Sequence, residues 1–138
     1  LNKICSLQTN LLYDFSLYTP GLGLYKKLPY HSPTKKIWRL NFQWEDDICF
    51  NIPNYDWENV YSVSPLSIFN FHPIHIFLNS KNNLNYSLFK NYTDLNPNYK
   101  MKEVEKFINY GIGARDSFNY LIKKDKCISF QEMLDLLE

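Results

Sequence analysis

The stretch that most constrains the fold runs from Pro65 to Asn79 and reads PLSIFNFHPIHIFLN. Its first half, Leu66 to Phe71, is a short apolar run rich in Ile and Phe, which is typical of a buried strand. His72 stands at the C-terminal end of that run, and Pro73 prevents a simple continuation of the strand because proline has no backbone N–H. A histidine in this position is where α/β barrels place catalytic groups, although a structural histidine beside the core is the competing interpretation.

A second predicted strand leads to a cluster of carboxylates. Lys36 to Phe42 alternates with period two and is followed by Gln43, Trp44 and the acidic run Glu45-Asp46-Asp47. Carboxylates just past a strand lie where the active site of a barrel would be. A solvated acidic loop, or a cap for a following turn, is the other interpretation of the same residues.

The order of predicted elements indicates the α/β class. Strands are expected at 11–15, 36–42, 66–72 and 127–129, and helices at 84–92, 101–110, 116–124 and after Ser129, where Glu132 completes a capping box. So few strands cannot close a (β/α)₈ barrel, which takes about 200 to 250 residues. The sequence therefore predicts either part of a barrel that is completed by an upstream segment, or a chain that folds only marginally.

Composition excludes several kinds of partner. The net charge is +1 and the basic residues are spread along the chain, so no nucleic-acid partner is expected. No apolar run is long enough to predict a transmembrane segment. Cys5, Cys49 and Cys127 lack a Cys-x-x-Cys spacing, which predicts reduced thiols and no disulfide framework. Eleven Tyr and ten Phe exceed the needs of a small core, so some are expected to line a groove that suits sugar rings.

Four segments resemble one known family. The run FHPIHIFLN, preceded by WEDD, is similar to the C-terminal half of polysaccharide deacetylase-like (NodB-homology) domains, in the branch found in surface-polysaccharide biosynthesis. Tyr13-Asp14-Phe15-Ser16 is similar to a Tyr-Asp-x-Ser strand of that group, and Gly111 to Glu138 resembles its closing helix, strand and helix. The resemblance implies that residues 1–138 form the C-terminal portion of a single such domain, an incomplete, deformed (β/α) barrel.

The resemblance also implies a reaction. Members of that family hydrolyse an N-acetyl group of a sugar with a divalent metal, zinc or similar, held by one Asp and two His. By this resemblance His72 matches the general acid, and Asp46 or Asp47 matches the carboxylate that orients and charges it. The early Asp-Asp and His-x-x-x-His metal motifs of the family are absent. We therefore expect no metal site made by these residues alone, metal ligands in a missing N-terminal half of the same domain, and no activity for this chain by itself.

The remaining candidate residues are assigned to binding of a carbohydrate substrate. They are Trp44, Glu45, His75 and Arg39, with a purely structural role for His75 and an outward-pointing Arg39 as the competing interpretations. Reduced cysteines and the surface-polysaccharide branch favour the bacterial cytoplasm.

Two other functions are kept open. The chain is alternatively a non-catalytic, carbohydrate-binding or structural remnant of such a barrel. A metal site made by His72 and His75 with an Asp, as in a small hydrolase, ranks lowest, because two histidines at this spacing after a proline lack a defined scaffold.

Overall fold

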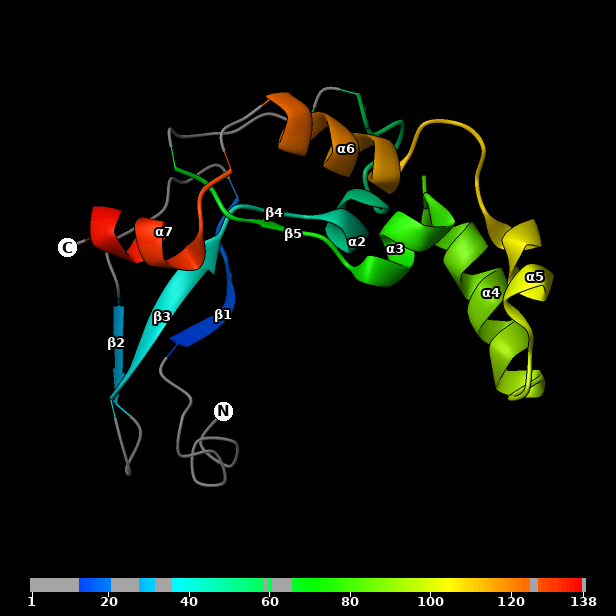
Figure 1. Cartoon of the computed structure of the whole chain (residues 1–138), viewed down its shortest axis with the longest axis horizontal. Coiled ribbons are helices and arrows are strands. Elements are labelled where there is room, and N and C mark those ends of the chain that lie inside the picture. Colours follow the sequence, from blue (N-terminus) through cyan, green and yellow to red (C-terminus); the bar gives the residue numbers. More distant parts are fainter. Residues whose placement is uncertain are drawn as a thin grey trace. The chain divides into compact units, whose positions relative to one another are not determined.

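The computed structural model describes residues 13–20, 28–31, 36–58, 60, 66–124 and 127–137. The chain divides into two compact units, each made of segments that are distant in sequence (Figure 1). Residues 1–44, 62–69 and 128–138 form the sheet unit, and residues 45–61 and 70–127 form the helix unit. The fold is mixed α/β with few strands, as the order of predicted elements indicated.

The sheet unit is built on β1 (Tyr13–Tyr18), β2 (Leu28–His31) and β3 (Lys36–Phe42). Strand β3 is central, parallel to β1 and antiparallel to β2. Its bounds are those predicted from the period-two pattern. Ile37 and Leu40 lie on opposite faces of β3 and are both buried, as expected for a central strand. Strand β2 carries no clear sequence signal, because it contains Pro29, which is tolerated at an edge.

Helix α7 (Phe130–Leu136) covers the core of the sheet unit, where Met133 and Leu134 pack with Leu40. Its first turn is closed by the predicted capping box. The Ser129 hydroxyl accepts a hydrogen bond from the Glu132 N–H, and the Glu132 carboxylate accepts one from the Ser129 N–H. The predicted strand at 127–129 is wrong, because these residues are irregular and lead directly into the cap.

Two short strands, β4 (Trp44–Glu45) and β5 (Phe69–Asn70), pair with each other. The predicted strand at 66–72 is therefore too long. Gln43 explains part of the difference, since its side-chain oxygen accepts a hydrogen bond from the backbone N–H of Ile68 at 2.6 Å. The backbone N–H of Gln43 also donates to the Ile68 carbonyl at 3.0 Å, so Gln43 holds this part of the chain outside any strand.

The helix unit contains helices joined by loops of different length (Figure 1). They are α2 (Asp46–Cys49), α3 (Pro73–Leu78), α4 (Asn83–Leu95), α5 (Met101–Val104), the 3₁₀ turn η1 (Glu105–Phe107) and α6 (Ala114–Lys124). The helix predicted at 84–92 corresponds to α4, which is longer than predicted. The single helix predicted at 101–110 is instead α5 followed by the 3₁₀ turn η1, and it ends at Phe107. Helix α3 corrects the expectation that the two histidines lack a helical scaffold: Pro73 begins this helix, because its fixed φ suits the first helical position.

A hydrogen-bond network around the buried Asn79 closes the other end of α3. Asn79 adopts the left-handed conformation with φ of 49°, and its side-chain N–H₂ donates to the Asp116 carboxylate at 2.9 Å. Its side-chain oxygen accepts from the backbone N–H of Arg115 at 3.0 Å, and the Arg115 guanidinium donates to the carbonyl of Ile76 at 2.9 Å. Gly113 leaves room for this contact, since a Cβ there would lie 2.3 Å from the Asn79 carbonyl oxygen.

Candidate functional site

The acidic run and His72 come together because β4 and β5 are paired and each leads into a helix. Asp46 begins α2, and His72 is the N-cap of α3. The Asp46 side chain is fully buried. Its Oδ1 lies 2.6 Å from His72 Nδ1, and its Oδ2 accepts a hydrogen bond from the His72 backbone N–H at 2.9 Å. Both carboxylate oxygens of Asp46 thus bind one histidine.

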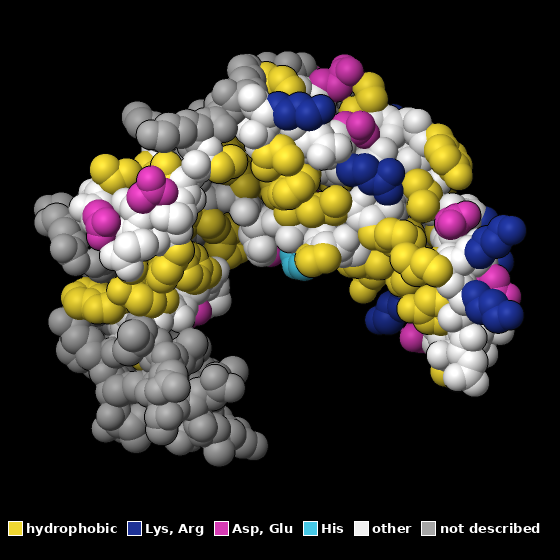
Figure 2. Space-filling view, viewed as in Figure 1, with side chains coloured by type: hydrophobic (Ala, Val, Ile, Leu, Met, Phe, Trp, Pro, Cys, Tyr) yellow, Lys and Arg dark blue, Asp and Glu magenta, His cyan; other side chains and the backbone are white. Residues whose placement is uncertain are grey.

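This pairing favours the protonated form of His72. Burial lowers the pKa of His72, but the hydrogen bond to Asp46 and the charges of Asp46, Asp47 and Glu45 outweigh burial and raise it. Nδ1 of His72 is occupied by the contact with Asp46. The other ring nitrogen, Nε2, lies 3.9 Å from Glu45 Oε1, which is too far for a hydrogen bond. The side chain is 38% exposed, and Figure 2 shows a histidine (cyan) at the surface beside hydrophobic side chains. Nε2 is therefore placed to donate a proton to a bound molecule.

The sequence did not decide whether Asp46 or Asp47 is the partner of His72, and the structure distinguishes them. Asp46 contacts His72, whereas Asp47 is exposed and lines a cavity beside it. Glu45 accepts a hydrogen bond from the Asn70 side chain at 2.6 Å. Burial and the nearby charge of Asp47 raise the pKa of Glu45. The three acidic residues therefore differ in burial and partner although they are adjacent in sequence.

Two candidate substrate contacts lie in the sheet unit. Arg39 forms an ion pair with Asp14 at 2.7 Å. Burial raises the pKa of Asp14, but hydrogen bonds from Ser16 and Arg39 outweigh it and lower that pKa. The ring of Trp44 packs against that of Phe69, with centroids 6.0 Å apart. Both residues thus have partners within their own unit, and their roles in substrate binding stay predictions.

His75 is held in one orientation by its neighbours. It is 4% exposed, and its Nδ1 lies 3.3 Å from the Ser80 hydroxyl. The rings of Phe50 and Tyr86 meet it edge-on, with centroids 4.6 and 4.9 Å away. Burial lowers the pKa of His75, which favours the neutral imidazole. His75 is therefore packed like a structural residue, while it also lines the cavity.

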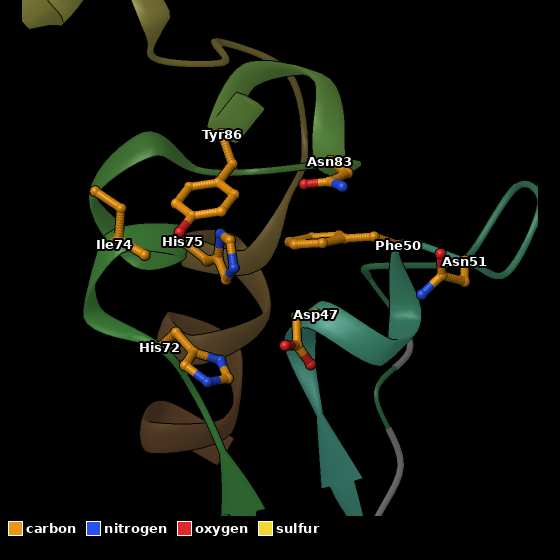
Figure 3. Close-up of a pocket in the computed structure, with 8 residues that line it drawn as sticks. All are labelled: Asp47, Phe50, Asn51, His72, Ile74, His75, Asn83 and Tyr86. Atoms are coloured by element: carbon orange, nitrogen blue, oxygen red, sulfur yellow. The ribbon is translucent and has the colours of Figure 1, made fainter. Parts of the chain in front are cut away.

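A polar cavity of about 420 Å³ opens at these groups (Figure 3). In Figure 3, Asp47 and Phe50 come from α2 and the loop after it, His72 and His75 from the start of α3, and Tyr86 from α4. Its volume is in the usual range for small-molecule sites. It is lined by Asp47, Phe50, Asn51, His72, Ile74, His75, Asn83 and Tyr86. Sequence reasoning missed Phe50, Asn51, Ile74, Asn83 and Tyr86. Only the general excess of aromatic residues pointed towards an aromatic groove.

Within the described part of the chain, two groups of side chains place ligand atoms within 4.8 Å of one another: Asp46-His72-His75 and Glu45-Asp47-His72. In the first group, Asp46 and His72 are already joined by hydrogen bonds through both carboxylate oxygens. The position of the ligand atoms in either group would allow a metal ion to bind, and the first group is the Asp, His72 and His75 set that the sequence ranked lowest. The expectation that these residues alone form no metal site stays a prediction.

Two observations bear on the cellular environment. Cys49 and Cys127 are free thiols, and burial raises the pKa of Cys49 to about 11. Among the helices that the structure describes, none has the length and hydropathy needed to cross a membrane. The cellular compartment itself stays a prediction.

Comparison with solved structures finds a protein of similar fold. A crystal structure at 1.90 Å resolution, from Bordetella bronchiseptica, aligns with a TM-score of 0.62 and 23% sequence identity. That protein is provisionally described as a polysaccharide deacetylase involved in O-antigen biosynthesis. The alignment covers 83% of this chain and 46% of that protein, so this chain spans about half of its length. The similarity shows the fold.

The family follows from the sequence. Residues 2–90 match the model of the WbmS-like polysaccharide deacetylase family, and the chain belongs to that family. The matched residues include β1, β3 and the whole cluster of Glu45, Asp46, Asp47 and His72. No curated protein sequence gives a significant match. The resemblance drawn from the sequence motifs is thus confirmed at the level of the family, while the completed barrel stays a prediction.

Proposed function

We propose that this chain carries the proton-donating part of a carbohydrate N-deacetylase. The reaction is hydrolysis of an N-acetyl group on a sugar of a surface polysaccharide or its precursor. Membership of the family supports the reaction class. One observation carries the proposal: His72 Nδ1 lies 2.6 Å from the buried Asp46, while the rest of the imidazole borders a polar cavity.

The chemistry of amide cleavage needs such a group. Water gives up a proton to a general base, which we assign to the part of the intact domain outside these residues, as its oxygen adds to the acetamide carbonyl carbon. The C–N bond then breaks only as the nitrogen gains a proton, because an amine anion is a poor leaving group. In the proposal His72 Nε2 gives that proton. Asp46 keeps the ring oriented and stabilises its charged form, so that His72 is protonated before the C–N bond breaks. The products are acetate and a free amine, and His72 is left neutral.

In the proposed reaction the intact domain needs a divalent metal ion. A divalent metal ion would polarise the carbonyl group and activate the water. We assign its ligands to parts of the intact domain outside residues 1–138, because the clusters found here suit proton transfer. We therefore expect these residues alone to release no acetate, and the missing N-terminal half to be the necessary partner.

The test is acetate release by the complete protein from N-acetylated oligosaccharides with divalent metal present. His72→Asn removes the proton donor and is expected to lower the rate about 100- to 10,000-fold. Asp94→Asn, an exposed acid in α4, is the matched control and should leave the rate unchanged. Full activity of the His72 variant would overturn the assignment of the acid.

A second candidate is non-catalytic binding of carbohydrate. The rings of Phe50 and Tyr86 in the cavity wall favour it, because aromatic side chains are suited to sugar rings. If the complete protein binds N-acetylated sugars but releases no acetate with metal present, this candidate replaces the enzyme.

A further inference from the structure

A second cavity of the helix unit, the apolar groove, has a volume of about 290 Å³. Helix α3 supplies Pro73, Ile74 and Phe77 to its lining, α4 supplies Phe89, and α5 with the loop before it supplies the remaining wall. Among the described residues that line it, none is charged, and only a tyrosine carries a polar side-chain atom. Such a lining is suited to hydrocarbon and offers little to sugar hydroxyls.

The apolar groove and the polar cavity are neighbours, because they share walls. Ile74 lines both of them. On α4, Tyr86 lines the polar cavity, and Phe89, one helical turn further on, lines the apolar groove. Figure 2 shows hydrophobic side chains (yellow) next to the surface histidine (cyan) and over α3 and α4. Since Pro73 and Ile74 directly follow His72, the apolar groove begins beside the proposed proton donor.

The apolar groove is partly open to solvent. In its wall Met101 is 61% exposed and Tyr99 is 39% exposed, whereas Val104 is buried. The rings of Phe89 and Tyr99 meet edge-on, with centroids 6.3 Å apart. Filling such an apolar hollow with hydrocarbon removes its surface from water, which is favourable. The groove therefore fits the hydrocarbon part of a ligand whose polar part lies in the adjoining cavity.

We propose that the apolar groove binds the hydrocarbon chain of an acyl group longer than acetyl on the sugar nitrogen. This inference rests on the proposed function, in which His72 Nε2 protonates that nitrogen. The acyl carbonyl carbon is bonded to the same nitrogen, so the chain begins beside His72 and has to leave the polar cavity on one side. The sides formed by Asp47, Asn51 and Asn83 are polar, whereas Ile74 leads into the apolar groove.

The reaction itself is unchanged by a longer acyl group. Water still cleaves the amide bond, and the products are a free amine and the carboxylate of the longer acid in place of acetate. An N-acetyl group has no chain to reach the apolar groove, so it is the poorer substrate. Binding energy from the chain is used only when the chain is present.

The test uses the complete protein with divalent metal and three glucosamine oligomers of equal length, which are N-acetylated, N-butanoylated or N-hexanoylated. The free amine that forms is measured, because it reports every acyl group alike. The value of kcat/KM is expected to rise with chain length and to be at least about tenfold higher for hexanoyl than for acetyl. Equal values for the three probes, or a fall with chain length, would overturn the inference.

The variant Met101→Asp assigns the effect to the groove. A carboxylate there loses water when the chain binds, so kcat/KM for hexanoyl should fall to within about twofold of that for acetyl, and the acetyl value should stay within about twofold of wild type. Met101→Leu keeps an apolar side chain of similar size and should keep the preference. Leu95→Asp, at an 83% exposed residue of α4 outside the groove lining, is the matched control and should also keep it.

Two results with Met101→Asp would count against the inference. A chain-length preference that survives this substitution would mean that the groove does not hold the chain. Loss of N-acetyl hydrolysis together with the preference would mean that the groove serves the packing of the domain, for example against its missing half.

Binding measurements separate this inference from the proposed function. If none of the probes is hydrolysed, calorimetry with the same three oligomers decides: hexanoyl binding at least about tenfold tighter than acetyl, with the difference lost in Met101→Asp, leaves the acyl-binding groove standing while the enzymatic function falls. Equal binding in that case overturns both. If acetate is released but chain length has no effect, the enzymatic function stands and the groove inference falls.

Discussion

The two ends of α3 are built in opposite ways. At its start His72 is partly exposed, and its second nitrogen lacks a hydrogen bond to the described residues. At its end Asn79 is 5% exposed, and its side chain makes hydrogen bonds to several segments. A helix of six residues has little stability of its own. The Asn79 end is therefore held by several segments, whereas at the other end Asp46 holds His72 and part of the imidazole stays exposed.

The largest effect on stability is expected from a substitution that disturbs the hydrogen-bonded end of α3 at Asn79. Gly113→Ala places a Cβ 2.3 Å from the Asn79 carbonyl oxygen, so the backbone has to move. We expect a loss of about 3 kcal/mol in the free energy of unfolding, measured by denaturant titration of the complete protein.

Gly111→Ala is the matched control for this substitution. Its Cβ would meet only the Asn109 side chain, at 3.4 Å, and the expected loss is below about 1 kcal/mol. Similar stability of the two variants would show that the end of α3 is not held as tightly as the contacts indicate.

A smaller loss is expected when the network alone is removed. Asn79→Gly keeps the left-handed backbone accessible but removes the amide that binds Asp116 and the Arg115 N–H. Removing these hydrogen bonds is expected to cost about 1 kcal/mol of unfolding free energy, because Asp116 is exposed and Arg115 is only partly buried, so water can replace part of what is lost. Asn54 is the other described non-glycine residue with positive φ, and it is exposed. Asn54→Gly should therefore be close to neutral, and an equal loss at both positions would point to backbone entropy instead of the network.

The start of α3, at His72, is tested by the pH dependence of acetate release. In the proposed reaction His72 is the acid, so the rate of acetate release should fall as pH rises through its pKa, which is held above the ordinary value of 6.5. Asp46→Asn removes the hydrogen bond and the charge that raise this pKa, so the alkaline limb of the pH–rate profile should move to lower pH. An unmoved limb with a lower overall rate would mean that Asp46 positions His72 without setting its pKa.

The sequence predicted those features that depend on local pattern. Strand β3 follows from strict alternation, and the cap of α7 follows from the spacing of Ser129 and Glu132. The meeting of the acidic run with His72 was also foreseeable, because both segments were expected to follow strands. The strand and the cap need no knowledge of distant contacts, whereas the meeting of Asp46 and His72 joins residues 26 positions apart.

Other features depend on contacts that no local pattern specifies. Pro73 was interpreted as the end of a strand, although the same residue is favoured at the start of a helix, and the choice depends on what α3 packs against. The sequence did not decide between Asp46 and Asp47, since the side-chain directions depend on where α2 begins. Tyr86 enters the cavity through the position of α4, which the sequence left open.

The smallest effect compares His72 with His75 through stability. The folded pKa of His75 is lowered by burial, so its contribution is present above pH 6.5 and is lost as pH falls through the folded value. The folded pKa of His72 is raised, so its contribution is complete below pH 6.5 and is lost as pH rises through the folded value. Plots of unfolding free energy against pH, wild type minus His75→Gln and wild type minus His72→Asn, should therefore slope in opposite directions. Slopes of the same sign would mean that the pKa values of the two histidines, three residues apart, are shifted in the same direction. The contrast between the partly exposed imidazole of His72 and the packed imidazole of His75 would then be lost.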